Sequence, residues 1–471
     1  MPDAVEDLYS SLSQTFRGNL LRPQSDGYQE ASGIWNGTIV RKPGLIVRCA
    51  DIADLQLAIR GAASRRVLTA IRCGGHSLAG YGTCDGGMVI DLSRMRDVGV
   101  SSQTRRARFG GGCLLGSIDT ATQPHGLAFP AGVVSHTGAS GLILGGGFGW
   151  LTRLCGLSCD NVTAFTLVTA DGNVVRADST ENSDLFWALR GGGGNFGVVT
   201  EFEVKLHPVH SVLLGTAFCL ERDIPLMLRR WREFMPDAPD NLKWNISLRL
   251  GQAEDKLPTE LLGKPIASQF VLWVGDPDQG RPHVEHALSI CKHIGVNQQV
   301  MSFVALQTMA DHEFPHGRRY YTKSGYFREL QDSSIDRMVA ATSAIPSPMT
   351  QIELAYLGGA AGRIGSDETA FGDRSSPFVV NLLGNWFSPA EDTANISWVR
   401  QLFAQLRPAM TPGVYINFMS GDEDDRTHEA YRERWDRLVA VKSKYDPGNF
   451  FRLNQNISPR TAATKTGTFQ D

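Results

Sequence analysis

One short run of the chain combines glycines with a single imidazole. The sequence RCGGHSLAG covers residues 72–80 and places His76 shortly after an apolar segment, 67–71. Glycines in such a turn let backbone N–H groups converge on an anion such as a pyrophosphate, because no Cβ atom blocks the approach. A lone histidine is more often a hydrogen-bonded structural residue, but a packed histidine needs no glycine cradle. The run therefore predicts a dinucleotide cofactor held by the loop and bonded through His76.

A carboxylate in the second half of the chain is the candidate base. In QIELAY, residues 351–356, strand alternation places three apolar side chains on one face and Glu353, with Gln351, on the other. A carboxylate among apolar groups is costly unless it is paired or protonated, and burial raises its pKa. Such a group is a poised general base. The pattern alone leaves a solvated strand face equally open.

The sequence does not predict a Rossmann dinucleotide site, a phosphate-binding loop or a cysteine-based metal site. Gly192-x-Gly194-x-x-Gly197 matches the dinucleotide fingerprint, but it follows a helix-like run and precedes a strand, the reverse of the order that the motif requires. The chain has no G-x-x-x-x-G-K-[ST] phosphate loop. Its 8 cysteines include no C-x-x-C pair, so we expect neither a zinc ribbon nor a thioredoxin-like site, and no metal.

The elements that must position these residues fall into two groups. The first 210 residues alternate between strand-like runs (45–48, 88–92, 166–170, 173–175) and helix-like runs (4–16, 54–65, 117–123, 184–189), and Asp171-Gly172 predicts a hairpin turn. Beyond Pro208 the strand candidates are 241–250, 269–274, 351–357 and 378–387, and the helical candidates are 225–234, 284–293, 334–344 and 393–406. This order predicts an α+β fold whose second domain is an antiparallel sheet covered by helices.

Length and composition fit a two-domain enzyme. With 471 residues the chain exceeds one ordinary core, and 42% hydrophobic with 20% charged residues is typical of a globular enzyme. A net charge of −3 gives no argument for nucleic acid as a partner. The acidic start lacks the features of a signal peptide, and no apolar run approaches the roughly 20 residues that span a bilayer. We expect a cytoplasmic monomer or homodimer that binds neither nucleic acid nor membrane.

These motifs are similar to those of a known family. R-x-G-G-H-S stands at 72–77, and the following blocks continue in the family's order: PAG (130–132), GGGFG (145–149), Asp160-Asn161, RGGG (190–193), NFGVVT (195–200), Tyr415-x-Asn417 and YDPxNxF (445–451). The chain thus resembles the FAD-linked oxidases of the vanillyl-alcohol-oxidase superfamily, with their PCMH-type FAD-binding domain, and specifically the berberine-bridge-enzyme-like branch. Within that branch it looks most like bacterial flavoprotein oxidases of aromatic polyketide pathways, such as the enterocin-pathway enzyme.

The resemblance implies a domain plan and a cofactor. Residues 1–210 would form the FAD-binding domain, 211–410 the substrate-binding domain, and 411–471 a C-terminal return that completes the FAD-binding domain. FAD would be bonded through its 8α-methyl carbon to His76. Several members add a second link from a cysteine at the position of Val134 here, so a single link is expected. The other residues placed along the cofactor are Arg72, Gly74, Gly75, Ser77, Gly80, Thr137, Ser140, Gly141, Gly145, Gly146, Gly147, Gly149, Asp160, Asn161, Asn195, Gly197, Val199, Tyr415, Asn417 and Asn454.

The resemblance also implies catalytic roles. A glutamate matching Glu353 acts as the base in the polyketide-pathway group, and a threonine matching Thr137 is associated with oxygen reactivity, although Thr137 fits an ordinary turn equally well. Tyr415 and Asn417 would share one face of a strand over 414–419 near the flavin ring. His136 fits a structural role. Three tyrosines and three tryptophans fit either an aromatic-accepting pocket or plain core packing: Tyr320, Tyr321, Tyr326, Trp244, Trp273 and Trp386.

The implied reaction is the oxidation of a small hydroxylated or β-keto/aromatic secondary metabolite. Glu353 would remove an acidic proton, a hydride would pass to flavin N5, and O2 would reoxidise the flavin and form hydrogen peroxide. Alternatives are an oxygenating cycle through a flavin–oxygen adduct, a dehydrogenase that passes electrons to a carrier, and a colourless binding protein without flavin. Ser247 stands where the enterocin-type enzyme has a tyrosine, so that enzyme's substrate is not transferred.

Overall fold

The computed structural model of the protein describes residues 2–460. The glycine-rich run at residues 72–80 begins at an edge strand of the first sheet. Its strand order is β1 (Asn19–Leu21), β2 (Leu45–Arg48), β4 (Met88–Asp91) and β3 (Thr69–Arg72). Strands β2 and β3 both pair in parallel with β4, and α3 (Ile52–Ser64) makes the crossover between them. The Asp51 carboxylate caps α3 by accepting bonds from two backbone N–H groups. Helices α1 (Pro2–Leu12) and α2 (Tyr28–Ser32) precede β2.

The second sheet is antiparallel and completes the first half of the chain. Its order is β5 (Val98–Ser101), β6 (Arg106–Gly110), β10 (Val198–Lys205), β8 (Val162–Val168) and β9 (Val174–Asp178). The predicted hairpin is confirmed, because β8 pairs with β9 and Gly172 adopts a φ of 76° in the turn. A small ladder joins β7 (Leu127–Ala128) to β11 (His207–Pro208). The helices of this part are α4 (Leu115–Thr122), α5 (Ala139–Leu144), α6 (Thr152–Cys155) and α7 (Ser183–Leu189).

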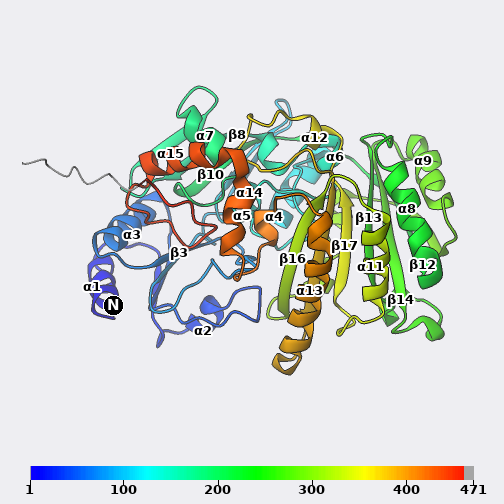
Figure 1. Ribbon diagram of the computed structural model, residues 1–471. Helices are drawn as coiled ribbons and strands as arrows, with labels where there is room; N and C mark the ends of the chain where they lie inside the picture. Colours follow the sequence, from blue (N-terminus) through cyan, green and yellow to red (C-terminus); the bar gives the residue numbers. More distant parts are fainter. Residues whose placement is uncertain (1, 461–471) are drawn as a thin grey trace, which may run out of the picture.

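The third large sheet has seven strands, all antiparallel to their neighbours. Its order is β15 (Ile294–Met301), β12 (Val212–Leu220), β14 (Pro265–Val274), β13 (Leu242–Leu250), β17 (Gln351–Tyr356), β18 (Phe378–Trp386) and β16 (Arg319–Phe327). Helices α8 (Ile224–Phe234), α11 (Asp332–Thr342) and α13 (Asp392–Leu406) lie over one face, and α9 (Pro277–Ser289) packs beside them (Figure 1). Shorter helices are α10 (Phe303–Thr308) and α12 (Ala360–Arg363). The predicted α+β fold with a helix-covered antiparallel sheet is confirmed.

Alternation along the strands divides the seven-stranded sheet into two chemically different faces. On β13 the side chains of Leu242, Trp244 and Ile246 belong to the core beneath the helices. The intervening residues face the opposite way, toward the first half of the chain, and several line a cavity there. The sheet thus presents one dry face to its helices and one functional face to the glycine-rich loops.

The C-terminal segment returns to the first half of the chain. Helices α14 (Thr427–Tyr431) and α15 (Trp435–Tyr445) pack near α7 and β10, and their apolar side chains share a core with them (Figure 1). The boundaries at 210 and 410 stay predictions, and residues 461–471 of the expected return lie outside the described residues. Among those described, no helix has both the length and the apolar character needed to cross a membrane.

The strand expected over 414–419 is wrong. Residues Ile416–Phe418 form a 3-10 turn, because the N–H of Phe418 donates to the carbonyl of Tyr415 and the N–H of Met419 donates to the carbonyl of Ile416. Alternating polar and apolar residues suggested a strand, but a turn with tertiary contacts on both sides produces the same local pattern. Tyr415 and Asn417 nevertheless meet, through a hydrogen bond within this turn.

Candidate active site

A cavity of about 510 Å³ lies between the glycine-rich loops and the functional face of the seven-stranded sheet. This volume is within the range of small-molecule and cofactor sites. The loops after β3, before α5 and before β10 form one wall together with the C-terminal return, and strands β13, β17 and β18 form the other. Gly141 and Gly194 line the cavity, and a Cβ atom on either would meet nothing within 4 Å. Bare backbone therefore faces open space there, as an elongated dinucleotide requires.

The loop that carries His76 is fixed where it leaves the sheet. Arg72, the last residue of β3, is buried, and its guanidinium forms an ion pair of 2.8 Å with Asp91 at the end of β4. Gly75 has a φ of 70°, a conformation that favours glycine. A Cβ atom on Gly74 would lie 2.4 Å from the backbone nitrogen of Gly138. The two loops thus touch backbone to backbone, which brings His76 against the segment 134–138.

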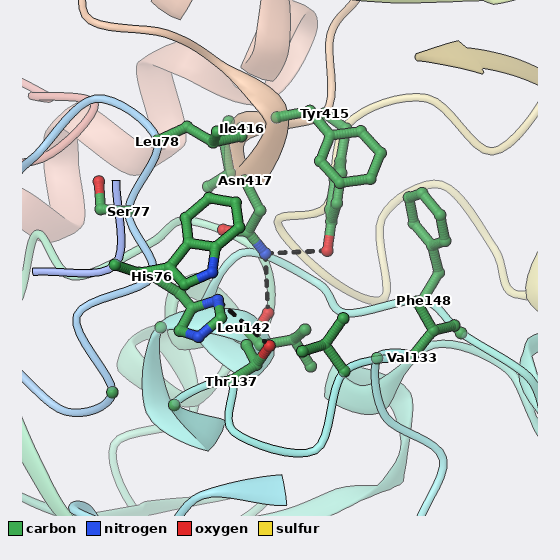
Figure 2. A pocket seen from close by; sticks show the side chains of 18 of the residues that line it. His76, Ser77, Leu78, Val133, Thr137, Leu142, Phe148, Tyr415, Ile416 and Asn417 are labelled. Carbon is green, nitrogen blue, oxygen red and sulfur yellow. Dashed lines mark hydrogen bonds between the residues drawn. The ribbon is translucent and has the colours of Figure 1, made fainter. Parts of the chain in front are cut away.

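The His76 imidazole is enclosed by aromatic and polar groups. Its Nε2 atom lies 2.7 Å from Nδ1 of His136. Its Nδ1 atom lies 3.5 Å from Oγ1 of Thr137 (Figure 2). Trp35 stacks on the ring at a centroid distance of 4.8 Å. Burial, reinforced by the nearby His136 and His316, lowers the pKa of His76 well below its usual range. The ring is neutral at pH 7, so one nitrogen carries a lone pair that can act as a nucleophile.

Three imidazoles meet at this point. Nitrogens of His76, His136 and His316 lie within 4.8 Å of one another, a spacing that a transition metal could bridge. No ion is needed to explain the contact between His76 and His136, because their facing nitrogens are at hydrogen-bond distance.

Tyr415 and Asn417 line the part of the cavity wall that the C-terminal return forms, and a hydrogen-bond network fixes them there. The amide of Asn417 donates to the Tyr415 hydroxyl at 2.8 Å and to the carbonyl of Leu142 at 3.0 Å (Figure 2). The N–H of Gly147 also donates to the Tyr415 hydroxyl, at 3.1 Å. Burial raises the pKa of Tyr415, so its phenol stays protonated. These bonds join the 3-10 turn to the glycine block that precedes it by some 270 residues.

Glu353 lies on the opposite wall, on β17. Its neighbours along the strand, Ile352 and Leu354, pack beneath the helices, which confirms the predicted alternation. The side-chain amide of Asn381 on β18 donates to the carboxylate at 2.7 Å. Burial raises the pKa of Glu353 to about 7, and the charge of Glu313 adds to the rise, while the bond from Asn381 opposes it. The carboxylate is therefore close to half ionised at neutral pH, which is the state of an effective general base.

Most of the residues predicted for the cofactor and for catalysis do line this one cavity. They are Arg72, Gly74, Gly75, His76, Ser77, Thr137, Ser140, Gly141, Gly149, Gly197, Val199, Glu353, Tyr415, Asn417 and Asn454. Val134 lines it too and offers no thiol. Cys73 also lines the cavity, but burial raises the pKa of its thiol to about 11, and the thiol contacts the carbonyl of Cys113.

The remaining predicted residues are not among those that line the cavity: Gly80, Gly145, Gly146, Gly147, Asp160, Asn161 and Asn195. Their contacts are structural. Asp160 forms a buried ion pair of 2.6 Å with Arg374. Asn161 holds two backbone carbonyls of its own loop, and Asn195 joins the carbonyls of Gly192 and Gln455. Direct contact of this group with a cofactor stays a prediction.

Sequence reasoning missed several polar residues of the cavity and left one alternative open. Lys243, Asn245, Gln351 and Asn381 line the sheet wall, and Trp35 lines the loop wall. In NLKWNISLRL the alternation that places Lys243 and Asn245 on one face is visible, but a polar strand face normally indicates solvent. The six tyrosines and tryptophans weighed for an aromatic pocket belong to packed clusters, so core packing is the correct interpretation.

Comparisons with known proteins agree with this arrangement. Residues 43–178 match the FAD binding domain family, and residues 414–458 match the family described as berberine and berberine like. The chain is 30% identical over 459 residues to an FAD-linked oxidoreductase of Dictyostelium discoideum, an alignment that covers 96% of this chain and 97% of that protein. It is also 30% identical to (R)-6-hydroxynicotine oxidase of Paenarthrobacter nicotinovorans, with 94% and 97% covered.

A solved structure shows the same fold. The crystal structure of 6-hydroxy-D-nicotine oxidase from Arthrobacter nicotinovorans superimposes with a TM-score of 0.85 at 27% identity, covering 95% of this chain and 99% of that one. The two matched segments, 43–178 and 414–458, both contribute residues to the loop wall of the cavity.

Proposed function

Since the chain belongs to the berberine-bridge-enzyme-like family of FAD-linked oxidoreductases, we propose that its cavity oxidises a small molecule with Glu353 as the general base and with FAD bonded to His76. The chain is an FAD-dependent oxidoreductase on the strength of these relatives. When bound, FAD supplies the acceptor for the two electrons of the substrate. The residues of the chain bind and orient the cofactor and the substrate, and Glu353 removes a proton from the substrate.

One observation carries the proposal. Glu353 and His76 come from opposite walls of the same cavity, one from the seven-stranded sheet and the other from the loop after β3. A substrate lying on the sheet wall is thus placed between a carboxylate with a pKa of about 7 and a cofactor anchored at the loop wall. Glu353 can take a proton from a hydroxyl or an acidic carbon of that substrate, and Asn381 holds the carboxylate in place.

The proposed anchor is a single bond to His76. Its neutral imidazole has a free lone pair, and the loop that carries it lines the cavity. Val134 contributes only an aliphatic side chain and offers no thiol for a second link. A covalent anchor keeps the cofactor in a defined position and makes its loss impossible without bond cleavage.

The substrate and the electron acceptor complete the proposal. We assign a hydroxylated or β-keto/aromatic compound as the substrate class, because Glu353 is suited to an acidic proton and the cavity is lined by rings such as Phe148, Trp150 and Phe270. O2 is the proposed acceptor, in line with the name of one relative as an oxidase.

A purified preparation tests each part. A flavin spectrum with an intact mass increased by that of FAD, retained after acid precipitation, is expected. Free colour in the supernatant would contradict the link to His76 without affecting the FAD assignment. After reduction under anaerobic conditions, rapid return of the oxidised spectrum on mixing with air supports an oxidase. Slow return in air, together with fast return on adding a quinone carrier, would identify a dehydrogenase.

A further inference from the structure

The sheet wall of the cavity carries a buried lysine that no step of the proposed reaction uses. Lys243 on β13 is only 2% exposed, and its side chain lines the cavity. Its Nζ atom has no hydrogen-bond partner among the described residues. Buried ammonium groups are otherwise found paired, because an isolated one loses its hydration without replacement. A lysine kept in this state indicates a ligand that supplies the missing partner.

Lys243 also experiences the charge of a second buried cation, Arg153. Its Nε atom donates to the carbonyl of Leu242 at 2.8 Å, and Nη2 donates to the carbonyl of Ala238 at 2.7 Å, so its charge is not balanced by these contacts. Asp240, the nearest carboxylate to Arg153, is engaged by Arg363. Burial and the Arg153 charge lower the pKa of Lys243 to about 7.

Other unsatisfied polar groups line the same cavity. The indole N–H of Trp150 and the amide oxygen of Asn245 lack partners among the described residues. Asn245 follows Lys243 by two positions and so shares its strand face. Lys243 pairs with Leu272 in the sheet register, and Leu272 packs in one cluster with Trp150. The Lys243 side chain and the indole N–H of Trp150 thus lie in the same region of the cavity wall.

The same strand relates Lys243 to the proposed base. Ser247 lies opposite Glu353 in the register between β13 and β17, and Lys243 precedes Ser247 by four residues on the same face. Four residues of strand span about 13 Å. A ligand that reaches both groups therefore carries its oxyanion and its reacting position at opposite ends.

We propose that Lys243, assisted by the Trp150 indole, is the specificity subsite that receives a carboxylate or phenolate oxyanion of the substrate. This inference rests on the proposed function, because it places that oxyanion within the same substrate compartment as Glu353. It defines the substrate as an anionic aromatic or enolic compound rather than a neutral sugar or amine. Lys243 positions the substrate, and proton removal remains with Glu353.

Calorimetric titration with a matched pair of probes tests the subsite. Benzoate and benzamide have the same shape and differ in charge, and heat of binding is measured whether or not the protein carries flavin. The wild type is expected to bind benzoate at least tenfold more tightly than benzamide. Lys243→Met should remove this preference, Lys243→Arg should retain much of it, and Lys264→Met, which removes a surface lysine, should leave it unchanged.

The outcomes separate the two proposals. Equal binding of benzoate and benzamide by the wild type, or an unchanged preference in Lys243→Met, would overturn the subsite. A preparation without flavin that shows the preference supports the subsite while contradicting the proposed function. Titration with 4-nitrophenolate gives the type of oxyanion: the anion that loses at least tenfold affinity in Lys243→Met is the one that the subsite accepts. Far-ultraviolet circular dichroism and melting curves confirm that both Lys243 variants fold.

Discussion

Nε2 of His76 and Nδ1 of His136 are 2.7 Å apart, so the residue proposed to bind the flavin is held by an imidazole from the adjoining loop. When Nε2 donates its proton to His136, the lone pair on Nδ1 of His76 is left free. Thr137, the next residue, faces that same nitrogen. The contact therefore orients the His76 ring and, with Nε2 as the donor, leaves Nδ1 available for a bond.

Removing the His136 ring is expected to impair flavin attachment. His136→Ala should lower the fraction of protein that carries covalent flavin, because the His76 ring loses the bond that fixes its orientation. Intact mass spectrometry and flavin fluorescence in a denaturing gel measure this fraction. His316→Ala is the matched control, since His316 meets the His76 ring only edge-on at 5.4 Å. Full attachment in His136→Ala, or stoichiometric zinc bound to the histidines, would contradict this account.

Replacing the proposed base should slow substrate oxidation. Glu353→Gln keeps the shape of the side chain but cannot accept a proton, so flavin reduction under anaerobic conditions should fall by roughly 10²–10⁴-fold. In the wild type the rate should rise with pH through about 7, because the carboxylate is active only when ionised. Glu233→Gln, a surface change, should have no effect. An unchanged rate in Glu353→Gln would remove this residue as the base.

The hydrogen bond from Asn381 sets the pH at which the base becomes active. It favours the charged form of Glu353 and so opposes the effect of burial. Asn381→Leu should therefore raise the pKa of Glu353 and move the midpoint of the pH–rate curve upward by about one unit. The curve is recorded by stopped-flow reduction between pH 5 and 10. A midpoint that stays in place would show that Asn381 does not act on the carboxylate.

A buried aspartate on α4 should make the fold less stable at high pH. Burial raises the pKa of Asp119 to about 8, and its Oδ2 atom has no partner among the described residues. The folded state keeps a proton that the unfolded chain releases near pH 4, so stability falls as pH rises from about 4 to 8. Asp119→Asn should raise the free energy of unfolding at pH 8.5 by on the order of 1–3 kcal/mol. Near pH 4 the two unfolding curves should converge; a constant difference at all pH values would refute the explanation.

The ion pair between Asp160 and Arg374 tests whether a predicted cofactor residue is structural. Both side chains are buried, so Asp160→Asn should lower the free energy of unfolding by about 3–5 kcal/mol. The folded variant should keep a normal ratio of flavin to protein, measured by absorbance. Asp336→Asn breaks an exposed pair with Arg229 and should change stability by less than about 1 kcal/mol. Loss of flavin from stable Asp160→Asn protein would instead support the predicted contact of Asp160 with the cofactor.

The sequence alone determined the features that depend on local pattern. Gly74, Gly75 and His76 form a turn after a strand, and Asp171-Gly172 forms a hairpin, because glycine supplies backbone conformations that other residues avoid. The period-two alternation of apolar residues correctly predicted that Glu353 lies on the face of its strand opposite to Ile352 and Leu354. The same kind of pattern failed at 414–419, where a 3-10 turn is stabilised by partners elsewhere in the chain.

Only the tertiary structure decided which polar faces are buried and which residues meet. Lys243 and Asn245 look like a solvated strand edge in the sequence, yet the first half of the chain covers them and turns them into a cavity wall. The contact between His76 and His136 joins loops 60 residues apart, and the pKa of Glu353 depends on Asn381 from another strand. Burial and charge environment are sums over neighbours brought together by folding, and for this reason local spacing does not contain them.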